Sequence, residues 1–371
     1  MLRTRVLWFI GLLLLANGTA WARPQLEGPE LKAAVTAAMK SVRDRRSSDE
    51  ERLESLDDLN DLGALGARAV ALFLERDLVR RRKDAGKGEG SLLKDFEKRA
   101  KALMKARLSS KVLAQIQADR TIILQLARGS NLTKDAIHAQ SDPALARLET
   151  QLTVTTNQVW DVDEPLFESF VEVLDLMVAE RDLHQRFVSS LEVLQDAGEH
   201  SLLKRLKQPE DPESFEPGLL AALNHIARHT TPMTSKDRKA LAANAVLEDG
   251  LLAEERKGCL RLDWIRIYLG LNALRIDAKL CAAGRDHSKD MQDEGFFAHE
   301  SPVAGKETPW KRAANFGTSA SGENIAAGAG DGESAIRMWW YSPGHHKNML
   351  GGHMRQGLGR TGSHWTQLFG G

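Results

Sequence analysis

Apolar residues recur every three or four positions over the first two thirds of the chain, and this spacing leaves little choice of local structure. From residue 23 to about 230 it runs through stretches such as LGARAVALFLERDLV and LFESFVEVLDLMVAERDL, rich in strong helix formers. Breaks rich in glycine, proline and polar residues separate the stretches, at KDAGKGEGS, ARGSNLTKD and KQPEDPESFEPG. We therefore expect residues 23–230 to form an all-helical domain, either a bundle or a stack of helical pairs.

The composition changes after a linker that we predict at residues 231–244. Both tyrosines, Tyr268 and Tyr341, lie beyond it, together with 19 of the 30 glycines and most of the tryptophans. A domain with many turns and aromatic packing fits this composition better than a further helical bundle does. We expect residues 245–371 to form such a domain, which places the whole chain in the α+β class with an all-α region in front.

Local signals outline the elements of this second domain. One helix is expected to end near Gly270, and another to begin after Asp277 as its N-cap and to end at Gly295. SGENIAAG predicts a short extended segment, and DGESAIRMWWYS predicts a helix. The β-forming residues around Gly362-Ser363 predict a terminal hairpin.

The first 22 residues have the pattern of a cleaved secretory signal peptide. Two arginines precede an apolar run, Val6 to Ala16, and Ala20-Trp21-Ala22 supplies an A-x-A cleavage site. The run is too short for a spanning helix, which needs about 20 apolar residues. We expect residues 1–22 to be removed, the mature protein to be secreted or periplasmic, and no transmembrane segment to remain.

The charge balance limits the classes of partner, and the two cysteines bear on the redox state of the compartment. The 51 basic and 51 acidic residues balance, so nothing in the charge favours nucleic acid as a partner. Export would bring Cys259 and Cys281 into an oxidising compartment, where a disulfide can persist. Because the sequence does not give the distance between them, a single disulfide and two separately buried thiols stay open as alternatives.

Three ionisable residues lie in tight segments of the second domain. His299 lies in FFAHESP, Glu323 in GENIAAG and His345 in SPGHHKN. Two imidazoles and a carboxylate are a reasonable ligand set for zinc or another divalent metal, provided that the fold brings them together. His346, directly after His345, is expected to face solvent, and His287 is expected to have a structural role within a helix.

These segments, taken in order with LDWIRIYLGLN, MWWYSPGHHKNML, GLGRTG and WTQLFG, resemble the CAP superfamily in its bacterial branch. The superfamily is also called SCP/TAPS or the cysteine-rich secretory protein family. The resemblance covers residues 245–371 and implies an α-β-α sandwich with a central antiparallel sheet. It also implies a surface cleft whose two histidines fall on His299 and His345 and whose acid falls on Glu323. The second acid of animal members is absent, and Ser342 stands near its place.

The turn before His345 supplies further candidates for this cleft. We expect Ser342, Trp339 and Trp340 to line it, with the two indoles as packing groups of its wall rather than as a binding platform.

The function favoured by these observations is that of a non-enzymatic extracytoplasmic binding module. Its cleft would hold a divalent metal or a small apolar ligand, or would meet a protein partner. One alternative is a hydrolase in which His299 or His345 acts as general base with Glu323 as its partner; the sequence has no nucleophile-elbow motif to support it. The other is a structural scaffold with a vestigial cleft, which the missing acid favours.

Overall fold

The computed structural model describes residues 27–44, 46–212, 215–247 and 250–371, which form two compact units. The first unit contains the described residues up to 87 together with 172–216, and the second contains 88–171 and the chain from 217 onward. Helices dominate, and the described strands all lie beyond residue 274, so the α+β prediction is confirmed. The predicted signal peptide lies outside the described residues. Within the described ranges, no helix combines the length and the apolar character that a membrane span requires.

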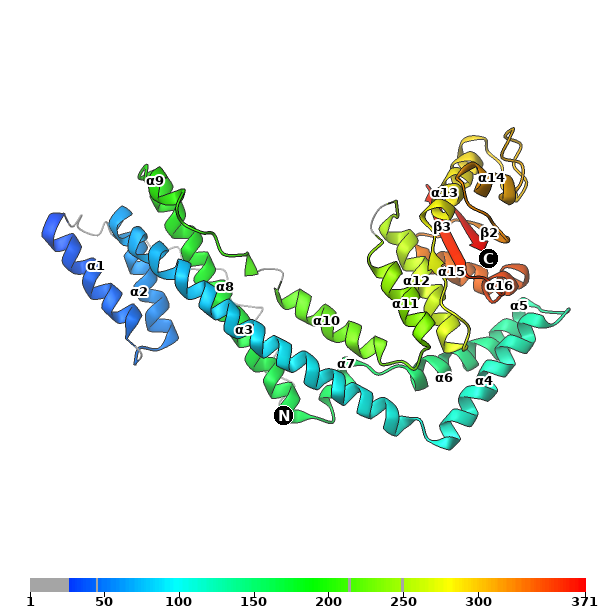
Figure 1. The fold of residues 1–371 in the computed structure, drawn as a ribbon, viewed down its shortest axis with the longest axis horizontal. Helices are drawn as coiled ribbons and strands as arrows, with labels where there is room; N and C mark the ends of the chain where they lie inside the picture. Colours follow the sequence, from blue (N-terminus) through cyan, green and yellow to red (C-terminus); the bar gives the residue numbers. More distant parts are fainter. Residues whose placement is uncertain (1–26, 45, 213–214, 248–249) are drawn as a thin grey trace. The chain divides into compact units, whose positions relative to one another are not determined.

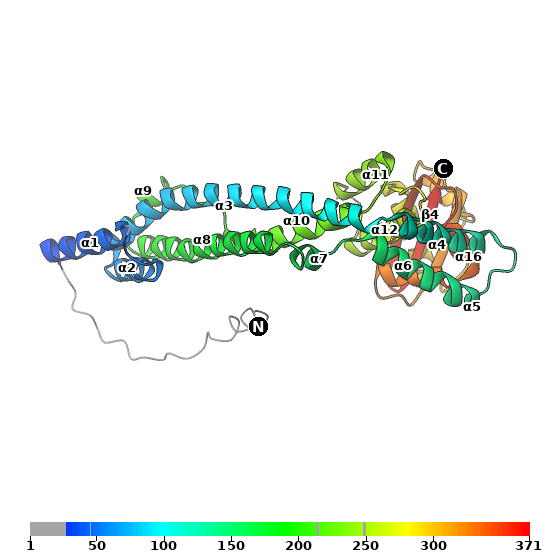
Figure 2. The ribbon, with the colours of Figure 1, turned by 90° about the horizontal axis from the view of Figure 1, so that it is seen from below.

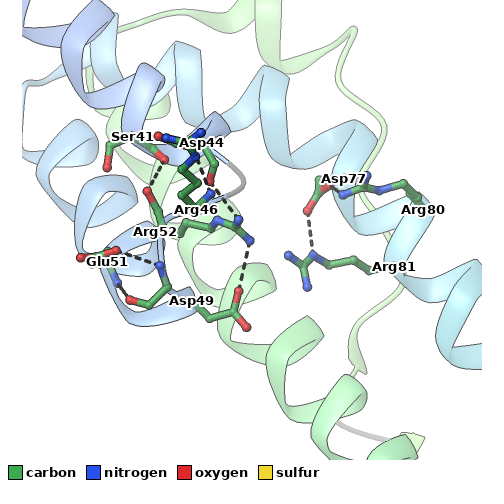
Figure 3. Close-up of polar contacts among 11 residues, drawn as sticks. Ser41, Asp44, Arg46, Asp49, Glu51, Arg52, Asp77, Arg80 and Arg81 are labelled. Carbon is green, nitrogen blue, oxygen red and sulfur yellow. Dashed lines mark hydrogen bonds and ion pairs between the residues drawn. The ribbon is translucent and has the colours of Figure 1, made fainter.

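The first unit consists of packed helices (Figure 1). They are α1 (Gly28–Arg43), α2 (Asp49–Asp61), α3 (Ala64–Arg107) up to Lys87, α8 (Glu164–Asp196) from Glu172 onward, and α9 (His200–Leu203). The core contains buried side chains from each helix, among them Val42, Leu59, Leu74, Phe187 and Leu202. Polar contacts fix the helix ends and faces: Arg52 reaches Asp49 within α2, and Arg81 reaches Asp77 within α3 (Figure 3).

Helix α3 runs without interruption through KDAGKGEGS, where the sequence predicted a break. A glycine inside a helix costs about 1 kcal/mol relative to alanine. Ala85 and Leu92, on either side of Gly86 and Gly90, are almost fully buried. Burial of the apolar face outweighs the local cost, as is usual for helices in folded proteins. The helix ends predicted at the other two breaks are confirmed by α4, which ends at Arg128, and by α9.

The second unit joins a further set of helices to the sheet region. Besides the remaining parts of α3 and α8, the described helices before α12 (Ala253–Tyr268) are α4 (Ser110–Arg128), α5 (Lys134–Ala136), the π-helix η1 (Ile137–Ser141), α6 (Asp142–Leu152), α7 (Thr156–Trp160), α10 (Phe215–His229), whose first two residues belong to the first unit, and α11 (Ser235–Ala245). Ile123 of α4 and Leu148 of α6 belong to the same hydrophobic core as Leu262 and Trp264 of α12. Figure 2 shows α4 and α6 against the C-terminal region. Helices α4 and α6 therefore share the core of the sheet region.

The stretch predicted as a linker, residues 231–244, is folded and contains most of α11. Thr234 and Asp237 form a capping box: Asp237 N donates to Thr234 Oγ1 at 3.2 Å, and Thr234 N donates to the Asp237 carboxylate at 2.9 Å. Asn244 is buried and donates to the Asp263 carboxylate at 3.0 Å. The polar residues that suggested a linker are thus the N-terminal cap of a docked helix.

The sheet has four strands among the described residues. They are β1 (Arg275–Ile276), β2 (Gly322–Ala327), β3 (Arg355–Thr361) and β4 (His364–Gly370), in the order β1-β3-β4-β2. Strands β3 and β4 form the predicted hairpin, and Gly362 at its turn has a positive φ of 56°. Strand β2 pairs antiparallel with β4, whereas β1 runs parallel to β3.

Helices cover both faces of this sheet and complete the α-β-α layers (Figure 1). Helix α13 (Ala278–Asp293) crosses β3 so closely that a Cβ atom added at Gly357 would lie 2.4 Å from Cys281 N. Next to it in β3, Gln356 donates to Cys259 O of α12 at 3.0 Å. Because neighbouring residues of a strand point to opposite faces, α12 and α13 lie on opposite sides of the sheet.

The remaining C-terminal helices are α14 (Pro309–Asn315), α15 (Gly332–Trp340) and α16 (Pro343–Met349). The predicted helix limits are confirmed. Asp277 accepts from Lys279 N at 2.9 Å as the N-cap of α13, and Gly270 and Gly295 follow their helices with φ of 74° and 67°. A positive φ favours glycine at such helix ends.

Candidate functional site

The carboxylate of Glu323 lies at the centre of the candidate site. Glu323 is in β2 and is 6% exposed. Its Oε1 atom lies 2.9 Å from Nδ1 of His299, in the loop after α13. Its Oε2 atom accepts a hydrogen bond of 2.6 Å from the guanidinium of Arg312, a fully buried residue of α14. Both oxygens of Glu323 are therefore engaged within the protein.

Arg312 also fastens the loop that carries His299. Its guanidinium donates to His299 O at 3.0 Å and to Lys306 O at 2.8 Å. A buried ion pair is stabilised when further hydrogen bonds satisfy its remaining donors. These contacts satisfy both terminal nitrogens of Arg312, whereas its buried Nε has no described partner. One side chain thus holds the strand with Glu323 and the loop with His299 in a fixed relation.

The contact with Glu323 sets the tautomer of His299. A neutral imidazole has one donor nitrogen and one acceptor nitrogen. Because the carboxylate oxygen beside a guanidinium acts as an acceptor, we assign the donor proton of His299 to Nδ1. In this neutral form the other nitrogen, Nε2, has a free lone pair, and the side chain is 51% exposed.

His345 supplies the second imidazole. It lies in the first turn of α16, and its ring centroid is 6.2 Å from that of His299. Burial lowers the pKa of His345, and the neighbouring His299 lowers it further. His345 is therefore neutral near neutral pH, the state in which an imidazole binds a metal or accepts a hydrogen bond.

This arrangement differs from the three-ligand metal site expected at His299, Glu323 and His345. Among the residues that the structure describes, no three His, Cys, Asp or Glu side chains gather in a way that could hold a metal ion. Glu323 is committed to His299 and Arg312, so it orients an imidazole instead of offering a free oxygen. The two imidazoles remain as the groups that a divalent metal could meet.

The two tryptophans expected to line a cleft as packing groups of its wall are buried side chains. Trp339 is 1% exposed and Trp340 is 4% exposed, so neither presents its ring as a surface. Trp339 Nε1 donates to Ile325 O of β2 at 2.9 Å. Ser342 is partly buried at the N-cap of α16, where its carbonyl accepts from His346 N at 2.7 Å. These residues support the turn that carries His345.

His346 was expected to face solvent and is instead fully buried. Its Nδ1 atom lies 2.7 Å from Trp340 O, and its ring centroid lies 4.2 Å from the indole of Trp340. The apolar surroundings lower its pKa. The helical turn of α16 explains the difference, because adjacent residues of a helix point in different directions.

His287 has the structural position that the sequence indicated. It is buried in α13, and its Nε2 atom lies 3.1 Å from Ala298 O, which fixes the residue before His299.

The two cysteines are free thiols in the structure, and both are fully buried. A hydrogen bond with Cys281, followed by burial, raises the pKa of the Cys259 thiol. The two side chains are therefore neighbours, one from α12 and one from α13, a proximity that no local pattern indicates.

Arg312 is the residue of the site that sequence reasoning missed. It lies in TPWKRAANFG, which predicts a short helix and nothing about the burial of its side chain. An arginine in such a segment is most often a surface residue. Only the folded structure, in which α14 packs against the sheet, shows that Glu323 is the partner of Arg312.

Comparison with known proteins agrees with this fold. A family model described as CAP, the cysteine-rich secretory protein family, matches residues 261–359. The chain is 40% identical over 105 residues to the uncharacterized protein YkwD of Bacillus subtilis, covering 27% of this chain and 40% of that protein. It is 31% identical over 106 residues to the uncharacterized membrane protein YlbC of the same organism, covering 28% and 31%. The chain thus spans less than half the length of these curated relatives.

Two solved structures are similar over part of the chain. One is an extracellular protein containing an SCP domain from Bacillus anthracis, with 30% identity, 37% of this chain and 44% of that chain covered, and a TM-score of 0.30. The other is an outer surface protein of Borrelia burgdorferi, with 21% identity, 30% and 87% covered, and a TM-score of 0.27. The C-terminal region of this protein is a bacterial CAP domain, as its motifs indicated.

Proposed function

We propose that this protein is an extracytoplasmic, non-enzymatic binding module whose CAP domain holds a divalent metal ion between His299 and His345. The observation that carries the proposal is the hydrogen-bonded chain from Arg312 through Glu323 to His299. It fixes one imidazole with a free nitrogen beside a second, neutral imidazole. A carboxylate behind a ligating histidine is a common way to orient the ring and raise its basicity.

A hydrolase is the second candidate, because a histidine oriented by a carboxylate is also the general base of acyl-transfer enzymes. Such an enzyme needs a nucleophile within reach of the base. Ser301 is 5% exposed, and its hydroxyl accepts from Val303 N at 3.2 Å. Ser342 stands at the N-cap of α16. Neither serine has a described hydrogen bond to His299 or His345, which favours binding over catalysis.

Calorimetric titration of Zn²⁺ into the full chain tests the proposal. We expect the wild type to bind, and His299→Ala and His345→Ala each to bind at least about tenfold more weakly. His200→Ala is the matched control, because His200 is an exposed histidine of α9 in the other unit and should leave the affinity unchanged. Circular dichroism would verify that each variant is folded.

Two results would overturn the metal site, and a third would overturn the non-enzymatic role. If the wild type does not bind Zn²⁺, a small apolar ligand or a vestigial cleft takes its place. If both alanine variants bind like the wild type, the metal lies elsewhere. If a hydrolytic activity of the wild type disappears in both folded variants, the hydrolase replaces the binding module.

A further inference from the structure

Asp142 lies far outside the matched family region, yet it contacts the segment that leads to His345. Its Oδ1 atom accepts from the indole Nε1 of Trp340 at 3.0 Å, and its Oδ2 atom accepts from the hydroxyl of Tyr341 at 3.0 Å. His138, four residues earlier, places Nδ1 at 3.2 Å from the same Oδ2. One carboxylate thus gathers three polar side chains, two of them from the CAP domain.

The local sequence explains why Asp142 occupies this position. Asp142 is followed by Pro143, which has no backbone N–H to continue the regular helical pattern. The preceding turn is the π-helix η1, and Asp142 N donates to Ile137 O across it. In the same turn the ring of His138 stacks on that of Tyr341, with centroids 4.0 Å apart and planes at 18°. Isolated π-turns often mark functional positions in helices.

The contacts of Asp142 add to those that hold the turn before His345. Trp339 is tied to β2 through Ile325 O, and the backbone oxygen of Trp340 is tied to His346 of α16. Asp142 of α6 supplies the remaining anchor, from a helix packed against this region (Figure 2). The chain then passes through Ser342, Pro343 and Gly344 directly into His345.

We propose that Asp142 is a positioning residue for the pair of imidazoles His299 and His345, because it holds Trp340 and Tyr341 so that the following turn sets His345 beside His299. The inference rests on the proposed function in treating these two imidazoles as the ligand-binding groups. It adds that recognition by the CAP domain of this protein requires helix α6, a part of the chain that the family match does not include.

Nuclear magnetic resonance on the full chain tests the positioning role of Asp142 without any ligand. In the wild type we expect a nuclear Overhauser contact between the rings of His299 and His345 and slow hydrogen exchange of the Trp340 indole N–H. In Asp142→Asn, which keeps only one acceptor oxygen for three donors, both signatures should weaken or vanish. Asp135→Asn, at an exposed acid seven residues earlier, is the matched control and should retain both.

Zn²⁺ titration of the same variants provides a second readout. Removing an outer-shell partner of a metal ligand typically weakens metal binding about 10- to 100-fold. Asp142 acts through Trp340 and Tyr341 and not through a bond to a ligand, so we expect a loss near the lower end of that range, about tenfold, for Asp142→Asn and none for Asp135→Asn. If Asp142→Asn does not fold, Tyr341→Phe replaces it, because it removes one of the donors and keeps the ring. We expect Tyr341→Phe to weaken the ring–ring contact and the affinity in the same direction.

The two proposals fail in different ways. A wild type that shows the ring–ring contact but does not bind Zn²⁺ overturns the metal proposal. The positioning role of Asp142 is then tested by the nuclear Overhauser contact and the hydrogen exchange of the variants. A folded Asp142→Asn or Tyr341→Phe variant that keeps both the ring–ring contact and the wild-type affinity overturns the positioning role of Asp142.

Discussion

Arg312 and Glu323 form a buried ion pair. Each side chain supplies the counter-charge that the other needs away from water. The guanidinium is fully buried, and the carboxylate side chain is 2% exposed. Replacing Arg312 leaves a buried carboxylate without a counter-charge, which costs far more than an exposed ion pair is worth.

We predict that Arg312→Met lowers the free energy of unfolding by about 3 to 5 kcal/mol, measured by urea denaturation. The control is Lys311→Met in the same helix, where an exposed lysine pairs with Glu307 at 3.0 Å. Removal of that surface pair should cost about 1 kcal/mol or less. Equal losses in the two variants would contradict the structural role of Arg312.

At the scale of single residues, the sequence indicated the groups that carry chemistry but not their partners. His299, Glu323 and His345 stood out because they lie in short, distinctive segments. Arg312 and Asp142 did not, since the contacts that define them come from residues 11 and 198 positions away. No local pattern encodes such pairings, and only the packed fold brings them together.

Element packing in the CAP domain depends on glycines that let helices approach the sheet. A Cβ atom at Gly357 would lie 2.4 Å from the Leu280 side chain and from the Cys281 backbone of α13. We predict that Gly357→Ala lowers the free energy of unfolding by about 1 to 3 kcal/mol, because the helix must move away from β3. Gly330→Ala, where a Cβ atom meets nothing within 4 Å, should change it by less than about 0.5 kcal/mol. Similar values for both in urea denaturation would contradict the close crossing.

Asp263 joins several elements, and its burial predicts a pH dependence of stability. It accepts from Asn244 of α11, from Leu274 N before β1 and from Gln356 of β3. Burial raises the pKa of Asp263 from 3.8 to about 7. Between these values the folded protein holds a proton that the unfolded chain has released, so this contribution to stability falls as the pH rises through that window.

The variant Asp263→Asn removes that titration. Relative to the wild type, its free energy of unfolding should therefore rise with pH between about 4 and about 7, by up to about 1 kcal/mol per pH unit. Urea denaturation of both proteins at a series of pH values measures the difference. A constant difference across the window would show that Asp263 titrates at its ordinary pKa.

The elements themselves were predictable where local signals decide them. The helix limits at Asp277 and Gly295 and the hairpin at Gly362 follow from capping and turn chemistry. The unbroken course of α3 did not, because burial overrode the two glycines within it. The short strand β1 was not predicted, because two residues carry no periodic pattern and the strand that pairs with it lies far along the chain.

For the whole molecule, the least predictable feature is the N-terminal boundary of the CAP domain. Ile123, Leu145 and Leu148 belong to the same core as Trp264 and Tyr268, although the sequence placed them in a separate helical domain. Apolar periodicity predicts that a helix has a buried face but does not say what covers it. The boundary drawn at residue 245 from composition therefore cuts through shared packing.

A chain shortened to residues 245–371 should for this reason expose part of its core. We predict that it binds a hydrophobic dye strongly and unfolds at lower urea concentration than the full chain, because the surface covered by α4 and α6 meets water. The full chain provides the control. A shortened chain with no dye binding and unchanged stability would restore the independent domain that the composition suggested.

The tautomer of His299 decides whether Glu323 orients the imidazole or stands free as a metal ligand. Long-range proton–nitrogen correlation spectra of the histidine side chains, recorded without metal near neutral pH, distinguish the two nitrogens. With Arg312 and Glu323 bonded as described, the neutral form of His299 carries its proton on Nδ1 and has an unprotonated Nε2 beside His345. A proton found on Nε2, with Nδ1 unprotonated, would contradict the arrangement. Glu323 would then be available as a metal ligand.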